Sequence, residues 1–497
     1  MAANQQCEKE IILAKSRGYI YDRDYEPLVN NSSLNFSSFI KSDYEPFGEA
    51  ENGDEKYNAI VKNGIVYNIS EKIINNYSKN IVNYNVVERY GENQLCEHII
   101  GYVDSDGYGV CGVEKAFDRI LDSNKGFLSL KYKVDGNGII IRGSGPELNN
   151  CGYDSDGGIV LTIDRKIQAI AENAISNSVI EKGAVVILKA ETAEILASVS
   201  VPGFDADSVE DYLNNADSPL INRVISSYPV GSVFKPVIAA SALKSGYKLS
   251  ENYKCNGYCN IGNNIFNCYN TTKHGVEYLN DAMSFSCNLY FINLGRQIGA
   301  DSIIDTASEF GFGKSLELCS SIIDYGGNLP DSEEITSDSQ LANLCFGQGD
   351  LLASPLQVAA AYCVFANGGY YNQPILMKEL VDDQKKVYGY YKGNAPVRVI
   401  DKSISEVISI CLYNNMLNGT GINGHSDYVT SAGKTATAQT GNKDINGKEK
   451  LCTWFAGFVP YENPQYVIVV MNENGSAASS DCAPVFKNIV DELFKIQ

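Results

Sequence analysis

The segment Pro229-Val-Gly-Ser-Val-Phe-Lys235 combines a turn with the start of a predicted helix. Its proline and glycine favour the turn, and Ser232–Leu243 then has the pattern of a helix. Residues three positions apart share a helix face, so Lys235 can reach Ser232. Serine becomes a strong nucleophile when an adjacent base takes its proton, and burial or a second cation can make lysine that base. The helix N-terminus also places the Ser232 N–H where negative charge would develop.

Two later triplets carry similar polar groups. Ser286-Cys-Asn288 offers a hydroxyl and an amide two residues apart, which can relay a proton and hold a substrate amide. Lys434-Thr-Ala436 lies on a predicted strand, where lysine and threonine can bind a carboxylate and the strand edge offers backbone N–H groups. Each motif alone is weak, because Ser-x-x-Lys occurs by chance in most long chains as a helix cap and a surface lysine. Their order along one chain is the informative observation.

Ser-x-x-Lys, then Ser-x-Asn, then Lys-Thr-Gly is the motif set of penicillin-binding proteins and serine β-lactamases. The chain resembles class B penicillin-binding proteins of Gram-positive bacteria over nearly its whole length. Further segments carry the resemblance: Arg17-Gly-Tyr-Ile-Tyr-Asp-Arg23, His98-Ile-Ile-Gly-Tyr-Val103 with Gly107, Gly109 and Glu114, Leu161-Thr-Ile-Asp164, Gly347-Gln-Gly349, Ser354-Pro-Leu-Gln357 and Ala366-Asn-Gly-Gly369.

The resemblance implies a serine D,D-transpeptidase that cross-links peptidoglycan stem peptides and is inhibited by β-lactams. Ser232 would attack the penultimate D-Ala carbonyl and form an acyl-enzyme, with Lys235 as the general base. Ser286 would pass the proton to the leaving amine, and Asn288 would orient the substrate. The resemblance implies no cofactor for catalysis.

It also implies how the substrate is held. Lys434 and Thr435 would bind the terminal carboxylate, and the backbone N–H groups of Ser232 and Thr437 would form the oxyanion hole. The positive charge of Lys434 would keep the general base neutral. In one departure from the family, Ala436 stands where glycine is usual, and its methyl group is expected to narrow the gap between sheet and ligand.

A cysteine cluster precedes the second motif. Cys255, Cys259, Cys268 and His274 lie close together in the sequence, and Asp281 follows near the start of the next predicted helix. Thiolate and imidazole are the ligands that zinc prefers. We therefore predict a structural zinc site of Cys255, Cys268 and His274, completed by Asp281 or Cys259. A Cys255–Cys268 disulfide and a set of unrelated thiols are the alternatives.

The composition is that of a globular protein. The chain has 497 residues, 44% apolar and 20% charged, which suits two to four domains. Its net charge of -20 disfavours nucleic-acid partners, since an acidic surface repels phosphate. Most of the 14 cysteines stand alone in apolar stretches and are expected to be buried free thiols. In an exported protein, so many thiols suggest a reducing, anaerobic habitat.

The sequence predicts two domains with different patterns of apolar and polar residues. Residues 1–155 have short apolar runs broken by Asn, Asp and Gly, which predicts an α+β pedestal or dimerisation-type domain. Residues 156–497 predict an α+β catalytic domain in which helices flank an antiparallel sheet, the penicillin-binding transpeptidase fold. Its predicted elements are a helix at 164–180 capped by Asp164, strands at 183–189 and 194–200, a mainly helical middle at 232–364, strands at 431–440, 453–459 and 466–471, and a helix at 484–496.

The resemblance also implies a place in the cell. No stretch approaches the roughly 18–20 apolar residues of a membrane span, and there is no signal-peptide pattern at Met1. Class B enzymes are anchored at the extracytoplasmic face of the cell membrane, so we expect that the anchor is missing from this chain. The expected partners are stem peptides, β-lactams and a membrane glycan polymerase.

Two other functions remain open at this point. In a β-lactamase or D,D-carboxypeptidase, water rather than an amine would take the acyl group; the long N-terminal part argues against a lactamase, which needs no pedestal. A non-catalytic cell-wall scaffold or β-lactam sensor would be favoured by an altered Ser232 or Lys235, and both residues are present.

Overall fold

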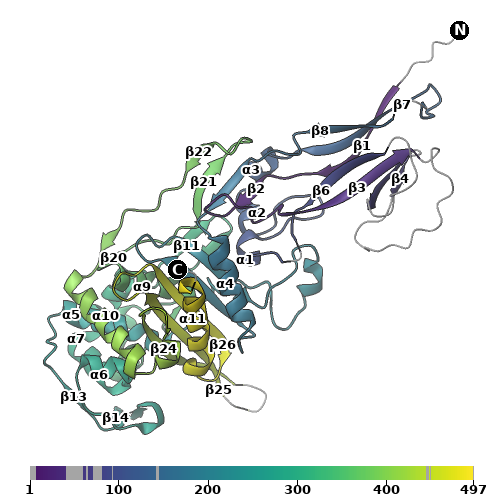
Figure 1. The fold of residues 1–497 in the computed structure, drawn as a ribbon. Coiled ribbons are helices and arrows are strands. Elements are labelled where there is room, and N and C mark those ends of the chain that lie inside the picture. The colour runs from purple at the N-terminus through teal and green to yellow at the C-terminus, as the bar shows by residue number, and fades with distance from the viewer. Residues whose placement is uncertain are drawn as a thin grey trace. The chain divides into compact units, whose positions relative to one another are not determined.

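The computed structural model describes residues 7–40, 60–62, 65–70, 81–91, 93–141, 145–443, 447 and 449–495. The chain forms two compact units (Figure 1). The smaller unit comprises residues 1–94, 117–160 and 379–390, and the larger comprises 95–116, 161–378 and 391–497. Neither unit is continuous in sequence, so the single boundary at 155/156 does not describe them fully.

The larger unit is built on a five-stranded antiparallel sheet with the order β11-β10-β26-β25-β24 (Figure 1). Every strand predicted for this domain is present, with ends shifted by a few residues. The strands are β10 (Gly183–Lys189), β11 (Ile195–Val201), β24 (Ala432–Lys443), β25 (Glu449–Val459) and β26 (Tyr466–Gly475). The sheet ends at β24, which makes β24 an edge strand.

Helices cover both faces of this sheet. Helices α4 (Arg165–Ser176) and α11 (Ala478–Phe494) share one core with alternate residues of β10 such as Val185 and Ile187. Helix α9 (Pro355–Ala366), buried along almost its whole length, packs against β10, β25 and β26. β10 and the first part of β26 are near-continuous apolar runs, as expected where both faces of a strand are buried.

The predicted N-terminus is correct for α4 and wrong for α11. Asp164 caps α4 as predicted, since its carboxylate accepts the N–H groups of Lys166 and Ile167 at 3.0 and 3.1 Å. The predicted start of α11 at Pro484 is wrong. The helix begins at Ala478, and Pro484 lies inside it. The Asp481 carboxylate accepts the N–H groups of Ser476 and Ala477, which supports an earlier start. Residue 496 lies outside the described residues.

The middle of the larger unit is mainly helical, as predicted. Besides α9, its helices are α5 (Lys235–Lys244), α6 (Leu279–Ser284), α7 (Asn288–Glu309) and α8 (Asp338–Leu344). Helix α10 (Lys402–Asn418) follows beyond the predicted range. Between α5 and α6, the chain forms two small antiparallel pairs: β13 (Tyr253–Cys255) with β16 (Gly275–Glu277), and β14 (Tyr258–Ile261) with β15 (Asn264–Asn267).

Residues 95–116, assigned to the pedestal from the sequence, pack within the larger unit. They contain α1 (Glu97–Ile100) and α2 (Gly112–Ala116). The Glu97 carboxylate accepts the Phe204 N–H at 2.9 Å, and the Cys96 N–H donates to the Glu172 carboxylate at 3.0 Å. Burial raises the pKa of Glu97 to about 7. These long-range contacts leave no local pattern in the sequence, which explains the misplaced boundary.

The smaller unit consists mostly of strands. Its sheets have the orders β1-β7-β8, β4-β5-β3-β6 and β2-β9-β21-β22. The strands are β1 (Cys7–Lys15), β2 (Tyr19–Tyr21), β3 (Ser32–Ile40), β4 (Ile60–Lys62), β5 (Ile65–Ser70), β6 (Val82–Glu88), β7 (Phe127–Val134), β8 (Glu147–Cys151), β9 (Gly158–Leu161), β21 (Met377–Val381) and β22 (Val387–Tyr390).

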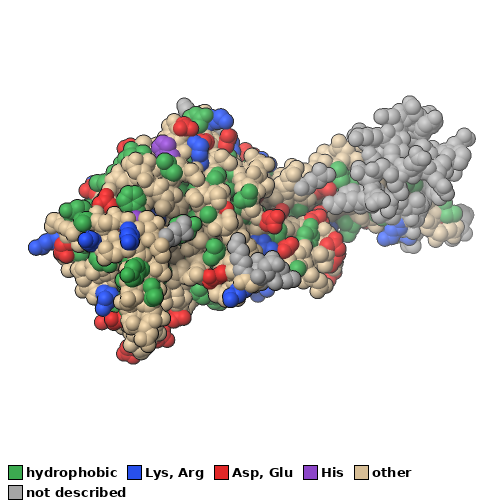
Figure 2. Space-filling view, turned by 90° about the horizontal axis from the view of Figure 1, so that it is seen from below, with side chains coloured by type: hydrophobic (Ala, Val, Ile, Leu, Met, Phe, Trp, Pro, Cys, Tyr) green, Lys and Arg blue, Asp and Glu red, His purple; other side chains and the backbone are tan. Residues whose placement is uncertain are grey.

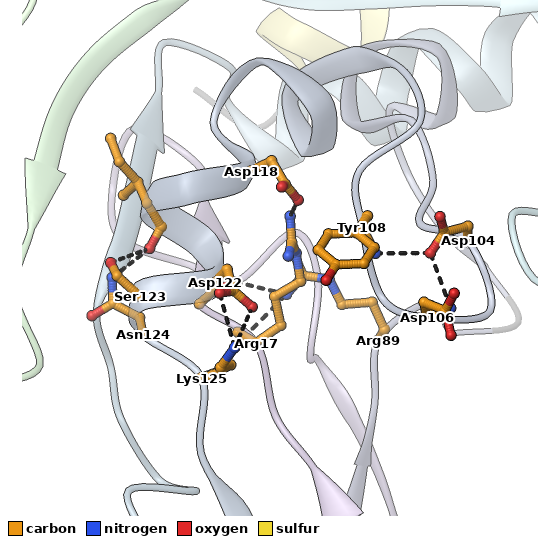
Figure 3. Close-up of polar contacts among 12 residues, drawn as sticks. Arg17, Arg89, Asp104, Asp106, Tyr108, Asp118, Asp122, Ser123, Asn124 and Lys125 are labelled. Atoms are coloured by element: carbon orange, nitrogen blue, oxygen red, sulfur yellow. Dashed lines mark hydrogen bonds and ion pairs between the residues drawn. The ribbon is translucent and has the colours of Figure 1, made fainter.

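One helix of the smaller unit, α3 (Asp118–Ser123), is tied to the segment before β2 by an ion pair. The Arg17 guanidinium donates to Asp118 at 2.7 Å (Figure 3). The same helix ends beside a local Lys125–Asp122 pair at 2.9 Å. Arg17, the first residue of the family-like segment 17–23, therefore joins that segment to α3.

On the face shown in Figure 2, acidic and basic side chains of the described residues are interspersed rather than gathered in a basic patch. Within the described part of the chain, no helix combines the length and the apolar character that crossing a membrane requires.

Candidate active site

Ser232 lies on a one-turn 3-10 helix (η4, Gly231–Phe234) that continues into α5 at Lys235. Two hydrogen bonds hold this turn. The Gly231 N–H donates to the Gly347 carbonyl at 2.8 Å, and the Trp454 indole N–H donates to the Pro229 carbonyl at 2.9 Å. Both hydrogen bonds join segments far apart in sequence. The turn of residues 229–234 that carries Ser232, here called the nucleophile turn, is therefore fixed by tertiary contacts.

The Lys235 side chain is fully buried, and its amine has three acceptors. Nζ donates to the Ser286 carbonyl at 2.7 Å, to the Ser286 hydroxyl at 3.2 Å and to Asn288 Oδ1 at 2.8 Å. Burial lowers the pKa of Lys235 to about 8, although the nearby Cys287, Cys268 and Glu277 oppose the shift. The first two motifs thus meet at one amine.

Ser286 has a backbone conformation that is unusual for a residue with a side chain. Its φ is 56°, in the left-handed region, at the junction between α6 and α7. Such a conformation costs of order 1–3 kcal/mol and is retained where surrounding contacts fix it. Here it lets the carbonyl and the hydroxyl of one residue both face Lys235. The next residue, Cys287, caps α7 by accepting the Tyr290 N–H at 3.4 Å.

Lys434, on β24, is also fully buried. Burial first, and then the positive charge of Lys235, lower its pKa well below the usual value. Its Nζ donates to the Thr435 carbonyl at 3.0 Å. The two lysines are therefore close enough to repel each other, which brings the third motif to the same site.

The remaining residues of the third motif lie along the edge strand. Thr435 is nearly buried, whereas Thr437 is exposed. A Cβ added to Gly231 would lie 3.4 Å from the Ala436 Cβ and 3.2 Å from the Ala438 Cβ. The Ala436 methyl group therefore faces the turn that carries Ser232, at the place where that turn has a glycine.

The cysteine cluster comes together in space, with one change of ligand. Cys255 Sγ lies 3.7 Å from Cys268 Sγ and 3.4 Å from His274 Nδ1. Cys268 Sγ lies 3.6 Å from Cys287 Sγ, and the donor atoms of all four residues lie within 4.8 Å of one another. The fourth donor atom in this group is the Cys287 sulfur, and neither the Asp281 carboxylate nor the Cys259 thiol predicted for that place belongs to it.

Asp281 and Cys259 are occupied elsewhere. The Asp281 carboxylate accepts the Tyr278 N–H at 3.1 Å and so caps its own helix, α6. Cys259 lies on the β14–β15 hairpin, where it pairs with Phe266. All 14 cysteines are free thiols, so the Cys255–Cys268 disulfide is not present. Cys287 was missed because it lies inside Ser286-x-Asn288.

The donor set fits a zinc ion. Zn–S bonds of about 2.3 Å in a tetrahedron place sulfur atoms about 3.8 Å apart, near the separations found here. Hydrogen bonding from Cys287 lowers the pKa of Cys268 to about 5, which favours a thiolate. Beside the cluster, Glu277 is buried with neither carboxylate oxygen hydrogen-bonded, and Oε1 lies 3.7 Å from His274 Nδ1. A cation would offset the cost of burying this group.

The site as a whole is that of a serine acyltransferase that uses a lysine base. The sequence model described as the penicillin binding protein transpeptidase domain matches residues 183–491, more than half of the chain. The chain belongs to this family of penicillin-binding proteins.

Relatives match along nearly the whole chain. Peptidoglycan D,D-transpeptidase MrdA of Haemophilus influenzae is 27% identical, over 97% of this chain and 85% of its own length. Stage V sporulation protein D of Bacillus subtilis is 26% identical, over 98% of this chain and 79% of its own length. These matches confirm the predicted resemblance to class B penicillin-binding proteins.

Solved structures confirm the fold. Penicillin-binding protein PBP2 of Helicobacter pylori has a TM-score of 0.72 at 21% identity, covering 98% of this chain and 99% of its own. The D,D-transpeptidase domain of a peptidoglycan glycosyltransferase from Eggerthella lenta has a TM-score of 0.71 at 22% identity, covering 98% and 99%.

The contact between Gly347 and the nucleophile turn gives a stability prediction. Gly347 has a φ of 75°, and a Cβ there would lie 2.1 Å from the Gly231 carbonyl oxygen. Gly349 has a φ of 82°, but the nearest atom to its added Cβ is a side-chain carbon at 3.4 Å. Gly347→Ala should therefore destabilise the protein by about 1–3 kcal/mol more than Gly349→Ala.

Urea unfolding of both variants measures the difference. The matched control carries the same backbone strain without the overlap, so equal losses would show that the Gly347–Gly231 contact does not constrain the turn.

Proposed function

We propose that this chain is a serine D,D-transpeptidase that cross-links peptidoglycan stem peptides and is inhibited by β-lactams. The proposal is carried by the buried amine of Lys235, a residue three positions after Ser232. Ser286 and Asn288 accept hydrogen bonds from this amine. The family and the names of the relatives support the same activity.

In the first step, Ser232 Oγ attacks the carbonyl carbon of the penultimate D-Ala, and its proton passes to Lys235. The carbonyl oxygen gains negative charge, which the N–H groups of Ser232 and Thr437 stabilise. The C–N bond then breaks, and the terminal D-Ala leaves as an amine that takes its proton through Ser286. The product is an ester between Ser232 and the donor peptide.

Ser286 is the natural carrier of that proton. A carbonyl oxygen and an amide oxygen can only accept hydrogen bonds, whereas a hydroxyl can also donate. Among the three partners of Lys235, only the Ser286 hydroxyl can therefore return a proton to the neutral amine or pass one on. In the second step, an amine of another stem peptide attacks the ester, and Ser232 regains its proton.

Binding of the substrate carboxylate favours the neutral form of Lys235, which is the form that acts as the general base. In the free protein, Lys235 has three acceptors for an ammonium group, while burial and repulsion disfavour charge on Lys434. A carboxylate bound at Lys434 and Thr435 favours the ammonium form of Lys434. That charge repels a proton from Lys235 and leaves it free to deprotonate Ser232.

Hydrolysis and non-catalytic binding are the competing functions. A D,D-carboxypeptidase or β-lactamase would transfer the acyl group to water, and a scaffold or β-lactam sensor would not turn over. The match to D,D-transpeptidases along almost the whole chain favours the amine acceptor.

We further propose that four residues, Cys255, Cys268, His274 and Cys287, would hold a structural zinc ion. Zinc would tie the β13–β16 insertion to the segment between Ser286 and Asn288, because Cys287 lies within that motif. The chemistry it supplies is structural, since no reacting group of the transfer is a ligand.

The cellular setting follows from the same proposal. The enzyme works at the extracytoplasmic face of the cell membrane, beside a membrane glycan polymerase. PBP2 of Helicobacter pylori has been solved in complex with MreC, so partner binding occurs in a protein of this fold. The free thiols support a reducing habitat, in an anaerobic Gram-positive bacterium.

Labelled penicillin tests the activity. The wild-type protein should form a stable covalent adduct by intact-mass analysis, with the label mapped to Ser232, and Ser232→Ala should form none. The reason is that the acyl-enzyme needs an amine acceptor that the assay lacks. Rapid turnover would establish a hydrolase instead, and the absence of any adduct would contradict the proposal.

The pH dependence of acylation follows from the lysine base. Lys235 must be neutral to accept the Ser232 proton, and burial lowers its pKa to about 8. With a ligand that lacks the carboxylate, such as a penicillin methyl ester, the second-order acylation rate should therefore rise about tenfold per pH unit below 8 and level off above it. Stopped-flow measurement between pH 6 and 9 checks this, and a flat profile would exclude Lys235 as the base.

Metal analysis tests the zinc site. The purified protein should contain about one zinc per chain, and Cys268→Ser should lose it because a central thiolate is removed. Cys259→Ser is the matched control, since Cys259 lies outside the cluster, and it should keep the metal. Equal metal content in both variants, or none in the wild type, would rule out this site.

A further inference from the structure

Beside the third motif lies a hydroxyl to which neither the sequence nor the family comparison assigns a function. Thr420 follows α10, in the sequence Gly419-Thr-Gly421. Its Oγ1 lies 2.7 Å from Thr435 Oγ1, which donates to it, and 3.4 Å from Lys434 Nζ, a second donor. One hydroxyl therefore contacts both side chains proposed to bind the substrate carboxylate.

A buried amide fixes the direction of these hydrogen bonds. Asn415 of α10 is fully buried, and its Nδ2 donates to the Gly433 carbonyl at 2.8 Å. Because that carbonyl requires a donor, Asn415 Oδ1 must face the other way, toward Thr420 at 3.1 Å. An amide oxygen can only accept, so the Thr420 hydroxyl donates to it.

The consequence is that both lone pairs of Thr420 remain for Lys434 and Thr435. A hydroxyl has one donor and two acceptor positions, and all three are used here. The backbone is fixed as well, since the Thr420 N–H donates to the Ser284 carbonyl at 3.1 Å, at the end of α6. The amide of Asn415 also ties α10 to β24 one residue before Lys434.

We infer that Asn415 and Thr420 are positioning residues for recognition of the substrate carboxylate. Thr420 offers an acceptor that holds the Lys434 amine at the site and favours its ammonium form. When a carboxylate binds, Thr435 can turn its single O–H toward it, and the freed lone pair of Thr420 remains available to Lys434. Asn415 acts one step further away, by orienting the Thr420 hydroxyl.

This inference rests on the proposed function, because it concerns how that reaction selects an anionic substrate. It makes a prediction that a packing role does not. Loss of the Thr420 hydroxyl should weaken reaction with a ligand that has a carboxylate, and should barely affect the same ligand with that carboxylate esterified.

The experiment compares Thr420→Val, which keeps the shape but removes the hydroxyl, with Thr420→Ser, which keeps the hydroxyl. Second-order acylation rates are measured with a labelled penicillin and with its methyl ester. Thr420→Val should acylate with the free acid on the order of tenfold more slowly than the wild type, because a hydrogen bond to a charged group is lost. Its rate with the ester should change little, so the preference for the acid falls.

The conservative variant and the wild type make the outcome decisive. Thr420→Ser should restore most of the preference for the free acid, and melting temperatures of both variants show whether the fold is kept. An unchanged acid-to-ester ratio in Thr420→Val, or the same loss in Thr420→Ser, would overturn the inference. Failure of the wild type to form any adduct would instead overturn the proposed function itself.

Discussion

The site depends on one buried amine. Removing Lys235 from water disfavours its charge, and the three oxygen acceptors around Nζ keep that disfavoured group in place. If the pocket were open to water, Lys235 would keep an ordinary pKa of about 10.4. A far smaller fraction of the amine would then be neutral at pH 7 than with the lowered pKa of about 8. The packing of α5 against α7, and of the η4 turn against β24, is therefore a chemical requirement as well as a structural one.

The unusual conformation of Ser286 follows from the same requirement. An ordinary helical turn would direct the carbonyl away from Lys235, whereas a φ of 56° presents both oxygens of the residue to one amine. Its neighbour Cys287 caps α7 and also belongs to the cysteine and histidine cluster. The strained residue is thus followed directly by one that is both a helix cap and a potential metal ligand, which explains how its conformation is maintained.

Local patterns in the sequence predicted most of the catalytic domain. The apolar runs at 183–189 and 466–471 and the cap at Asp164 are local signals, and the strands and the helix appear where they were expected. The contacts that depend on distant segments were not predictable in this way. Residues 95–116 join the larger unit through Cys96 and Glu97, whose partners lie many residues away.

The same limit applied to the site. Ser232, Lys235 and Ser286 could be selected because a motif order marks them. Thr420 and Asn415 could not be selected from the sequence. A threonine after a helix and an asparagine inside one are common, and nothing marks them as functional until their contacts with β24 are known. Cys287 did carry a usable signal: it is a further cysteine 13 residues after His274, overlooked because the motif treated its position as arbitrary.

The alanine at position 436 shows how a departure from a motif can be accommodated elsewhere. Its methyl group faces Gly231, and a side chain on Gly231 would approach both Ala436 and Ala438 within van der Waals contact. Gly231 also has a φ of 60°, which disfavours any other residue there. The space that a glycine at 436 would leave is therefore partly supplied by the glycine in the opposing turn. The extra methyl group therefore packs between β24 and the turn that carries Ser232. The groups that would bind the substrate belong to the residues on either side of it, Thr435 and Thr437.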